Sequence, residues 1–217
     1  MTTLTRTVIV PSVTLSQRKF ATLKELEEIY KNIVAELVDF GFRNGIKSFT
    51  GLKKQKYREL RDRYPSLPSH YIHTACQDAS TRIKSFLKLK RRGIAKTEKP
   101  EVNKVSIWLD DHLWRLIGRT TIRVATHRGS IYIPLEPHKL YWKHLNSGWR
   151  LRTRPKIKLD YEKRMILIYF VFEKDVQQEM GSSLLLPVDI NEGDVTIKLG
   201  NKVFVLLTDI KKVTVGY

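Results

Sequence analysis

The sequence predicts an α+β protein in which a basic helical region lies between an N-terminal strand and a small β-barrel. The first observation is the stretch 3–13, which mixes Thr with Val and Ile, residue types that favour strands. The second is the segment from about Gln17 to Lys90, where apolar residues recur every three or four positions, as on one face of a helix. The third is the segment after a polar linker at 95–100, where short apolar runs separated by turn residues are typical of a small barrel.

Composition indicates a globular protein of the cytoplasm. Of the 217 residues, 41% are hydrophobic and 29% are charged, which excludes a disordered chain. No apolar run is long enough to span a membrane, and the first residues lack the apolar core of a signal peptide. Cys76 is the single cysteine, which excludes intramolecular disulfides and cysteine-rich zinc sites. We therefore expect a soluble, cytoplasmic protein with no membrane partner.

The helical region is predicted to hold three helices. The first, at about 17–42, has one apolar stripe and nearly balanced charge, which indicates a supporting role. The second, at 52–64, is strongly basic and ends before Pro65 and Pro68. Ser69 is the predicted N-cap of the third helix, which runs to about Lys90. Its apolar face consists of Ile72, Cys76, Ala79, Ile83 and Phe86.

Excess positive charge is concentrated in this region and predicts a nucleic-acid partner. The chain carries a net charge of +18, and the segment 43–99 alone has 16 Lys and Arg against 4 Asp and Glu. Such a block is the electrostatic footprint of a polyanion-binding protein. The alternative is a solvated basic surface that serves solubility. The candidate nucleic-acid-binding residues of the second and third helices are Lys53, Lys54, Lys56, Arg58, Arg61, Arg63, His73, Gln77, Lys84, Lys88, Arg91 and Arg92.

Strands are predicted at 105–109, 121–126, 130–135, 149–154 and 165–172, with a tight turn at 127–130 and a short helix at 137–145. One face of this extended segment is expected to be basic, because basic residues alternate at Arg150, Arg152, Arg154, Lys156 and Lys158. Arg150, Arg152 and Arg154 join the candidate nucleic-acid-binding residues. Tyr141, Trp142 and Trp149 are candidates for stacking on bases, and core packing is the alternative role for these aromatic rings.

A carboxylate near the C-terminus is a candidate metal ligand. The apolar run 184–188 is typical of a buried strand, Asp189 follows it, and 195–199 alternates like the second strand of a hairpin. Mg²⁺ prefers oxygen ligands and keeps several waters, so one or two carboxylates suffice to bind it. The alternative is that Asp189 only forms the turn. The six histidines show no close metal-ligand spacing.

Three passages resemble the N-terminal half of the TnpB/OrfB family of transposon-encoded, RNA-guided DNA nucleases. Residues 64–79 (YPSLPSHYIHTACQDA), followed by Lys84 to Phe86, are similar to the second recognition helix of that family. Residues 127–135 (HRGSIYIPL) are similar to its barrel hairpin, and residues 186–196 (LPVDINEGDVT) to its first RuvC motif.

The resemblance implies a wedge-like barrel whose first strand lies at 1–16, an inserted recognition lobe at 17–95, the rest of the barrel at 96–180 and the start of an RNase H-like (RuvC) domain at 183–217. It also implies that Asp189 is the catalytic first Mg²⁺ ligand and that the partners are guide-like RNA and DNA. The remaining carboxylates and the zinc-binding cysteines of the family find no match here, so this chain alone is expected to be inactive as a nuclease. The alternative is a naturally truncated, non-catalytic RNA- or DNA-binding regulator or ribonucleoprotein component.

Overall fold

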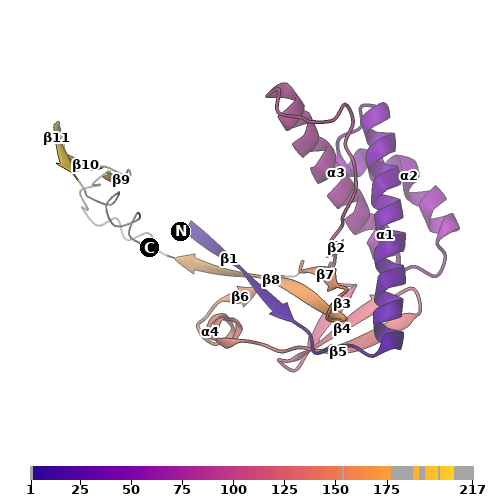
Figure 1. Ribbon diagram of the computed structural model, residues 1–217. Helices are drawn as coiled ribbons and strands as arrows, with labels where there is room; N and C mark the ends of the chain where they lie inside the picture. Colours follow the sequence, from indigo (N-terminus) through magenta and orange to yellow (C-terminus); the bar gives the residue numbers. More distant parts are fainter. Residues whose placement is uncertain (1, 153, 177–187, 191–193, 200, 208–217) are drawn as a thin grey trace. The chain divides into compact units, whose positions relative to one another are not determined.

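The computed structural model (Figure 1) describes residues 2–152, 154–176, 188–190, 194–199 and 201–207. The chain divides into two compact units, one at 2–176 and one that contains the C-terminal strands, and each is described by itself. The helices are α1 (Gln17–Arg43), α2 (Phe49–Arg63), α3 (Ser69–Arg91) and α4 (Lys139–Asn146). The strands of the first unit are β1 (Thr2–Pro11), β2 (Ile107–Trp108), β3 (Trp114–Ile117), β4 (Thr121–Thr126), β5 (Gly129–Pro134), β6 (Arg150–Leu151), β7 (Lys156–Asp160) and β8 (Met165–Val176). The α+β class is confirmed.

The three predicted helices form where the apolar periodicity places them, and two of them have side-chain caps. Ser16 accepts a hydrogen bond from the backbone N–H of Lys19 at the start of α1, and Ser48 accepts one from the N–H of Gly51 at the start of α2. The predicted N-cap at Ser69 is wrong. Pro68 is the N-cap of α3 and makes no side-chain cap bond, because Ser69 is already helical.

One long ladder joins the two ends of the first unit. β1 pairs with β8 in antiparallel register from Thr2 opposite Val176 to Pro11 opposite Leu167. The order of this sheet is β1-β8-β7-β2, with β6 also on β8, and every pairing in it is antiparallel. Because α1, α2 and α3 lie between β1 and the other strands in sequence, the helical region is an insertion into the β-structure, as Figure 1 shows.

The described strands do not close into the predicted barrel. β3, β4 and β5 form a separate antiparallel meander, which meets the first sheet through a single bridge between Ser12 and Leu135. Pro11 and Pro134 stand beside that bridge and have no N–H to donate, so the ladder cannot extend through them. β2 and β6 are each only two residues long, so the edge of the sheet opposite β1 is open as well.

The core lies between α1, α3 and the sheets. Tyr30 of α1 and Tyr71 of α3 are fully buried and meet edge to face, with ring centroids 6.3 Å apart. The Tyr71 hydroxyl donates a 2.6 Å hydrogen bond to the carbonyl of Ala125 in β4, which ties the helices to the meander. Tyr141 of α4 is fully buried against Phe170. Its predicted alternative role in the core is therefore confirmed, and Trp142 and Trp149 are partly buried against the same core.

The turn at 127–130 and the end of α1 show two local requirements for glycine. Gly129 has a backbone φ of +99°, which residues other than glycine rarely adopt. It closes the β4–β5 hairpin, as predicted. A Cβ on Gly41 would stand 2.6 Å from the carbonyl oxygen of Ile46 and 2.7 Å from the Cδ1 of Ile83. Glycine at this position allows α1, α3 and the α1–α2 connection to approach closely.

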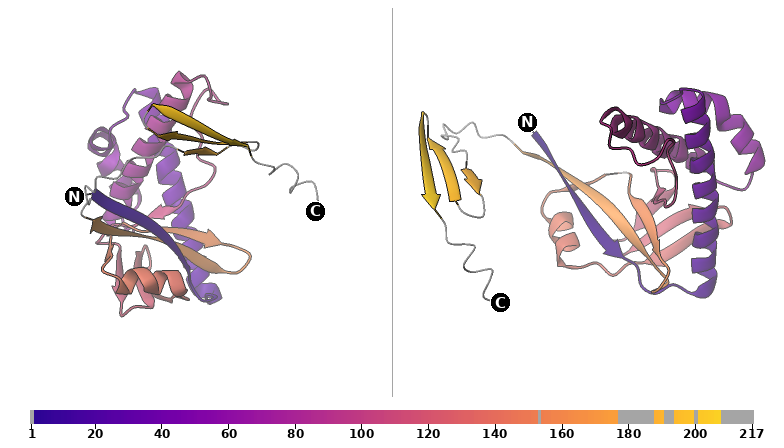
Figure 2. Two further views of the ribbon diagram at one scale, coloured as in Figure 1. Left: turned by 90° about the vertical axis from the view of Figure 1, so that its left-hand side faces the viewer. Right: turned by 45° about the horizontal axis from the view of Figure 1, so that its top comes forward.

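The C-terminal unit contains an antiparallel meander of β9 (Val188–Ile190), β10 (Asp194–Leu199) and β11 (Lys202–Leu207), with β10 in the middle (Figure 2). The predicted strand at 195–199 is confirmed. Of the predicted strand at 184–188, residues 184–187 lie outside the described residues. A three-stranded meander occurs in many folds, so it establishes antiparallel β-structure here and no particular fold family.

Candidate nucleic-acid interface

Helices α2 and α3 pack side by side and carry most of the predicted nucleic-acid-binding residues. Leu52 and Leu60 are the buried residues of α2, and the hydroxyl of Ser80 in α3 donates to the backbone carbonyl of Lys47 at 2.8 Å, just before α2 begins. The structure therefore fixes the orientation of both helices, and each predicted cation can be sorted by whether its charge is already paired.

Three predicted cations of α2 are engaged within the protein. Lys56 Nζ lies 2.8 Å from a carboxylate oxygen of Glu36 and 2.5 Å from one of Glu59. Hydrogen bonding to Glu36 and then to Glu59 raises the pKa of Lys56. Arg63 pairs with the same two carboxylates, and Arg61 donates to backbone carbonyls in the turn before α3. These contacts indicate that Lys56, Arg61 and Arg63 hold α1, α2 and the turn before α3 together. The sequence alone had placed all three among the nucleic-acid-binding residues.

The predicted basic face at 150–154 is largely neutralised by β8. Strand pairing sets Arg150 opposite Glu173, and the Arg150 guanidinium lies 2.7 Å from Asp175. Arg152 lies 3.0 Å from Glu173. Arg154 is exposed and makes no side-chain hydrogen bond or ion pair among the described residues. The alternation of the three arginines is real in sequence, but the acidic end of β8 compensates two of them.

Apart from Lys53, which contacts His73, the remaining predicted cations of the helical region are exposed, and within the described part of the chain their charged groups have no hydrogen-bond or ion-pair partner. We call this set the free cations: Lys54, Arg58, Lys84, Lys88, Arg91 and Arg92. They belong to the exposed sides of α2 and α3, where their charges face water. An uncompensated cluster of this kind is what remains available for phosphate groups.

Two hollows hold most of the free cations. A groove of about 770 Å³ is lined by Lys47, Lys84, Leu87, Lys90 and Arg91, and we call it the basic groove. A shallower hollow of about 410 Å³ is lined by Phe49, Thr50, Lys53, Lys54, Tyr57 and Arg58, and we call it the aromatic hollow. Each hollow has a lining residue near the start of α2, Lys47 in the first and Phe49 in the second. In the aromatic hollow, cations and aromatic rings share one surface.

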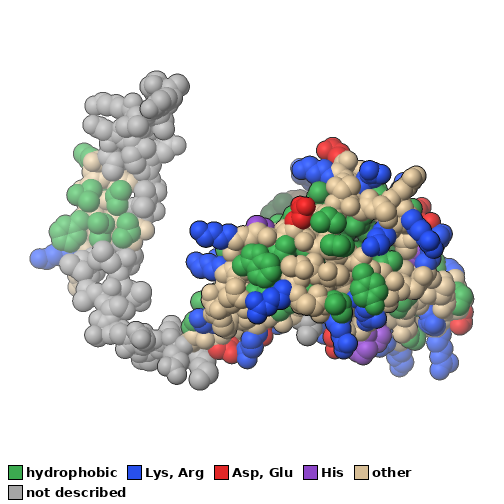
Figure 3. Space-filling view, turned by 90° about the horizontal axis from the view of Figure 1, so that it is seen from below, with side chains coloured by type: hydrophobic (Ala, Val, Ile, Leu, Met, Phe, Trp, Pro, Cys, Tyr) green, Lys and Arg blue, Asp and Glu red, His purple; other side chains and the backbone are tan. Residues whose placement is uncertain are grey.

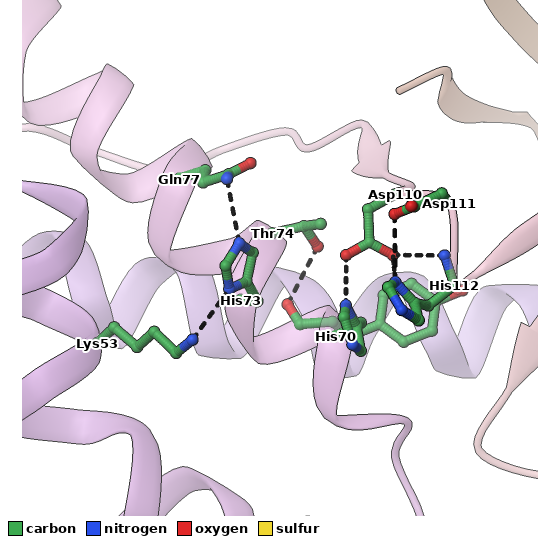
Figure 4. A network of polar contacts seen from close by, with 9 residues as sticks. Lys53, His70, His73, Thr74, Gln77, Asp110, Asp111 and His112 are labelled. Carbon is green, nitrogen blue, oxygen red and sulfur yellow. Dashed lines mark hydrogen bonds and ion pairs between the residues drawn. The ribbon is translucent and has the colours of Figure 1, made fainter. Parts of the chain in front are cut away.

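His73 and Gln77, also predicted to bind nucleic acid, belong to a polar network beside this surface (Figure 4). Lys53 Nζ lies 3.2 Å from His73 Nδ1, and Gln77 Nε2 lies 3.2 Å from His73 Nε2. The His73 ring also meets Phe49 edge to face. Burial, and then the charge of Lys53, lower the pKa of His73, so the imidazole is neutral at pH 7. His73 thus orients Lys53 and Phe49 in place of offering a positive charge.

Basic side chains also occur away from α2 and α3. Figure 3 views the first unit from below Figure 1, and Lys and Arg side chains project from several edges of that face among hydrophobic and acidic ones. Exposed cations of this kind include Lys139 and Lys143 on α4 and Arg115 on β3.

None of the helices in the described residues is long and apolar enough to cross a membrane.

The predicted metal ligand at Asp189 is placed only by its backbone, which lies in β9 opposite Thr196 of β10. The side chain of Asp189 lies outside the described residues, so Mg²⁺ binding there stays a prediction.

The structure brings together His70, Asp110 and His112, a cluster that sequence analysis missed (Figure 4). His70 is far from the other two in sequence, and the acidic residues Asp110 and Asp111 beside His112 were the one local signal.

Comparison with known proteins gives two matches. Residues 26–125 match the model of a family described as the Uncharacterized protein MJ0013 family. This segment runs from within α1 to within β4 and includes all of α2 and α3. The whole chain is similar to the Uncharacterized protein MJ0857 of Methanocaldococcus jannaschii, with 35% identity over 231 residues, covering 99% of this chain and 84% of that protein.

Proposed function

We propose that this chain, which belongs to the same family as the archaeal protein MJ0857, binds the sugar-phosphate backbone of structured nucleic acid through helices α2 and α3. The observation that carries the proposal is the sorting of the basic residues. Lys56, Arg61 and Arg63 are engaged inside the protein, whereas the free cations remain exposed beside the basic groove and the aromatic hollow.

Backbone contacts explain why so many separate cations would serve one ligand. Each Lys or Arg that neutralises a phosphate releases condensed counterions, which favours binding whatever the base sequence. Phe49 and Tyr57 in the aromatic hollow add surfaces on which an unpaired base can stack, a common feature of RNA recognition. The ligand that fits best is therefore RNA with a duplex and an unpaired end or loop.

The resemblance to the TnpB/OrfB family extends the proposal to a guide-like RNA and its hybrid with DNA. Recognition of such a hybrid depends on backbone geometry, for which a broad basic surface is suited. In this proposal the helical insertion holds the nucleic acid, and Asp189 in β9 is the Mg²⁺ ligand of an RNase H-like unit. The alternative role as a ribonucleoprotein component involves no cleavage, so it requires only nucleic-acid binding by the helical insertion.

Fluorescence anisotropy with a duplex RNA, an RNA–DNA hybrid and a duplex DNA of equal length tests the proposal. The variant Lys84→Glu, Lys88→Glu, Arg91→Glu should lose most of the affinity for each duplex and keep its thermal transition, because the buried face of α3 is unchanged. The control variant Arg115→Glu, Lys139→Glu, Lys143→Glu changes net charge equally but on β3 and α4. Equal losses in both variants, or no binding by the unaltered protein, would contradict the proposed interface.

A further inference from the structure

We infer that His70, Asp110 and His112 form a binding site for Zn²⁺ or a chemically similar divalent transition-metal ion. One ligand atom from each of these side chains can be chosen so that all lie within 4.8 Å of one another. His70 Nδ1 lies 2.5 Å from Asp110 Oδ2, and His112 Nδ1 lies 4.0 Å from Asp110 Oδ1. The site consists of residues of the first unit and does not depend on the proposed nucleic-acid binding.

The carboxylate is held in place by the backbone before any metal arrives. The Asp110 side chain is 10% exposed, and its Oδ1 accepts a 3.1 Å hydrogen bond from the backbone N–H of His112. The carbonyl of Asp110 accepts a bond from Leu113, which closes the turn between β2 and β3. Oδ2 is thereby left facing His70. Support of this kind around a ligand carboxylate fixes its orientation and strengthens metal binding.

The two imidazoles come from different elements and lie beside that carboxylate, although His112 Nδ1 is closer to Asp111 Oδ1, at 3.2 Å. His70 stands in the first turn of α3, next to Tyr71, whose buried hydroxyl fixes this turn against β4. His112 follows Asp110 in the β2–β3 turn, and its ring stacks on that of His70 with centroids 3.9 Å apart. Since the His112 side chain is 62% exposed, its ring can rotate without disturbing the core.

Neighbouring histidine His73 is not a fourth ligand. Its ring centroid lies 6.1 Å from that of His70, and Lys53 Nζ and Gln77 Nε2 each lie 3.2 Å from one of its ring nitrogens. The cluster therefore supplies three protein ligands. Three ligands leave one position of a tetrahedral Zn²⁺ open to water or an anion, as in catalytic rather than structural zinc sites.

The chemistry and the spacing of the donors select the class of metal. Two imidazoles and one carboxylate suit Zn²⁺ and its transition-metal neighbours, whereas Mg²⁺ and Ca²⁺ favour oxygen ligands alone. Metal–ligand bonds of about 2.0–2.2 Å in a tetrahedron place the donors roughly 3.3–3.6 Å apart. The His70–Asp110 contact is shorter than this and the His112–Asp110 contact is longer. A metal taking the place of the proton shared by His70 and Asp110 would lengthen the first contact, and rotation of His112 would shorten the second.

Titration of the untagged, chelator-treated full chain with Co²⁺, followed by displacement with Zn²⁺, tests the site without nucleic acid. We expect one ion per chain, the visible absorption of tetrahedral Co²⁺, and a melting temperature about 5–10 °C higher when Zn²⁺ is at a hundred times its Kd. His112→Ala should weaken binding by at least about tenfold, and, because the side chain is exposed, it should keep the fold.

His73→Gln is the matched control, because it removes a histidine one helical turn from His70 that is not a ligand. It should bind Co²⁺ as the unaltered protein does. Asp110→Asn gives a second ligand variant, read by the same absorption. The inference is overturned if the unaltered protein binds no stoichiometric metal, or if His112→Ala binds it as tightly as His73→Gln does.

Discussion

The salt dependence of nucleic-acid binding should report how many of the free cations contact phosphates. On duplex DNA, log K falls against log salt with a slope of about −0.9 for each phosphate neutralised. If all the free cations are engaged, the slope is about −5.4, and raising salt from about 50 to about 200 mM lowers affinity roughly two-thousandfold. Cations that already pair with carboxylates, such as Lys56 and Arg63, add nothing to this slope.

Replacing some of the free cations with neutral residues allows the salt slopes of two proteins to be compared. The variant Lys84→Gln, Lys88→Gln, Arg91→Gln keeps half of the free cations, so its slope should fall to about −2.7 and its loss over the same salt range to roughly fortyfold. Filter binding or anisotropy across a salt series measures both slopes. A paired-cation control, Arg150→Gln with Arg152→Gln, should keep the slope of the unaltered protein, because Glu173 and Asp175 already compensate those charges.

Parallel salt dependences for the unaltered protein and the α3 variant would show that these side chains do not contact phosphates. A slope near zero for the unaltered protein would refute electrostatic backbone binding altogether. A reduced slope in the Arg150 and Arg152 control would refute the distinction between paired and free cations.

Three further predictions concern buried groups and Asp189. Tyr71→Phe should lower the free energy of unfolding by about 1–3 kcal/mol, because it leaves the partly buried carbonyl of Ala125 without its donor. Denaturant unfolding measures this, and the exposed Tyr132→Phe should show almost no change. Burial raises the pKa of the Cys76 thiol to about 12, so a thiol reagent at about pH 8 should react only with unfolded protein, and stability should decline as pH rises above 9, where only the unfolded thiol ionises. Reaction of native protein would contradict this. Asp189→Ala should leave RNA affinity unchanged, and neither protein should nick supercoiled DNA with Mg²⁺ and guide RNA, because two-metal cleavage requires more carboxylates than this one. Nicking that disappears in Asp189→Ala would refute the last prediction.

Local patterns were enough for elements whose own residues carry a complete signal. The stripe of α1 from Phe20 to Phe40, the alternation of β4 and the continuous apolar run at the start of β8 predict these elements within a few residues. Shorter strands gave weaker signals. β3 was missed, and the predicted strand at 149–154 shrinks to Arg150–Leu151, because a two-residue strand is defined by its partner β8 and not by its own sequence.

The sequence by itself determined the α+β class, the three long helices and the concentration of positive charge within them, since helix periodicity and net charge are properties of contiguous residues. Tertiary structure alone decided which charges remain free. Glu36 of α1 neutralises Lys56 and Arg63 of α2, and β-pairing brings Glu173 to Arg150. It alone assembled His70 with Asp110 and His112. Such pairings depend on distances between segments that only folding brings together. A local sequence pattern describes neighbouring residues and carries no information about those distances.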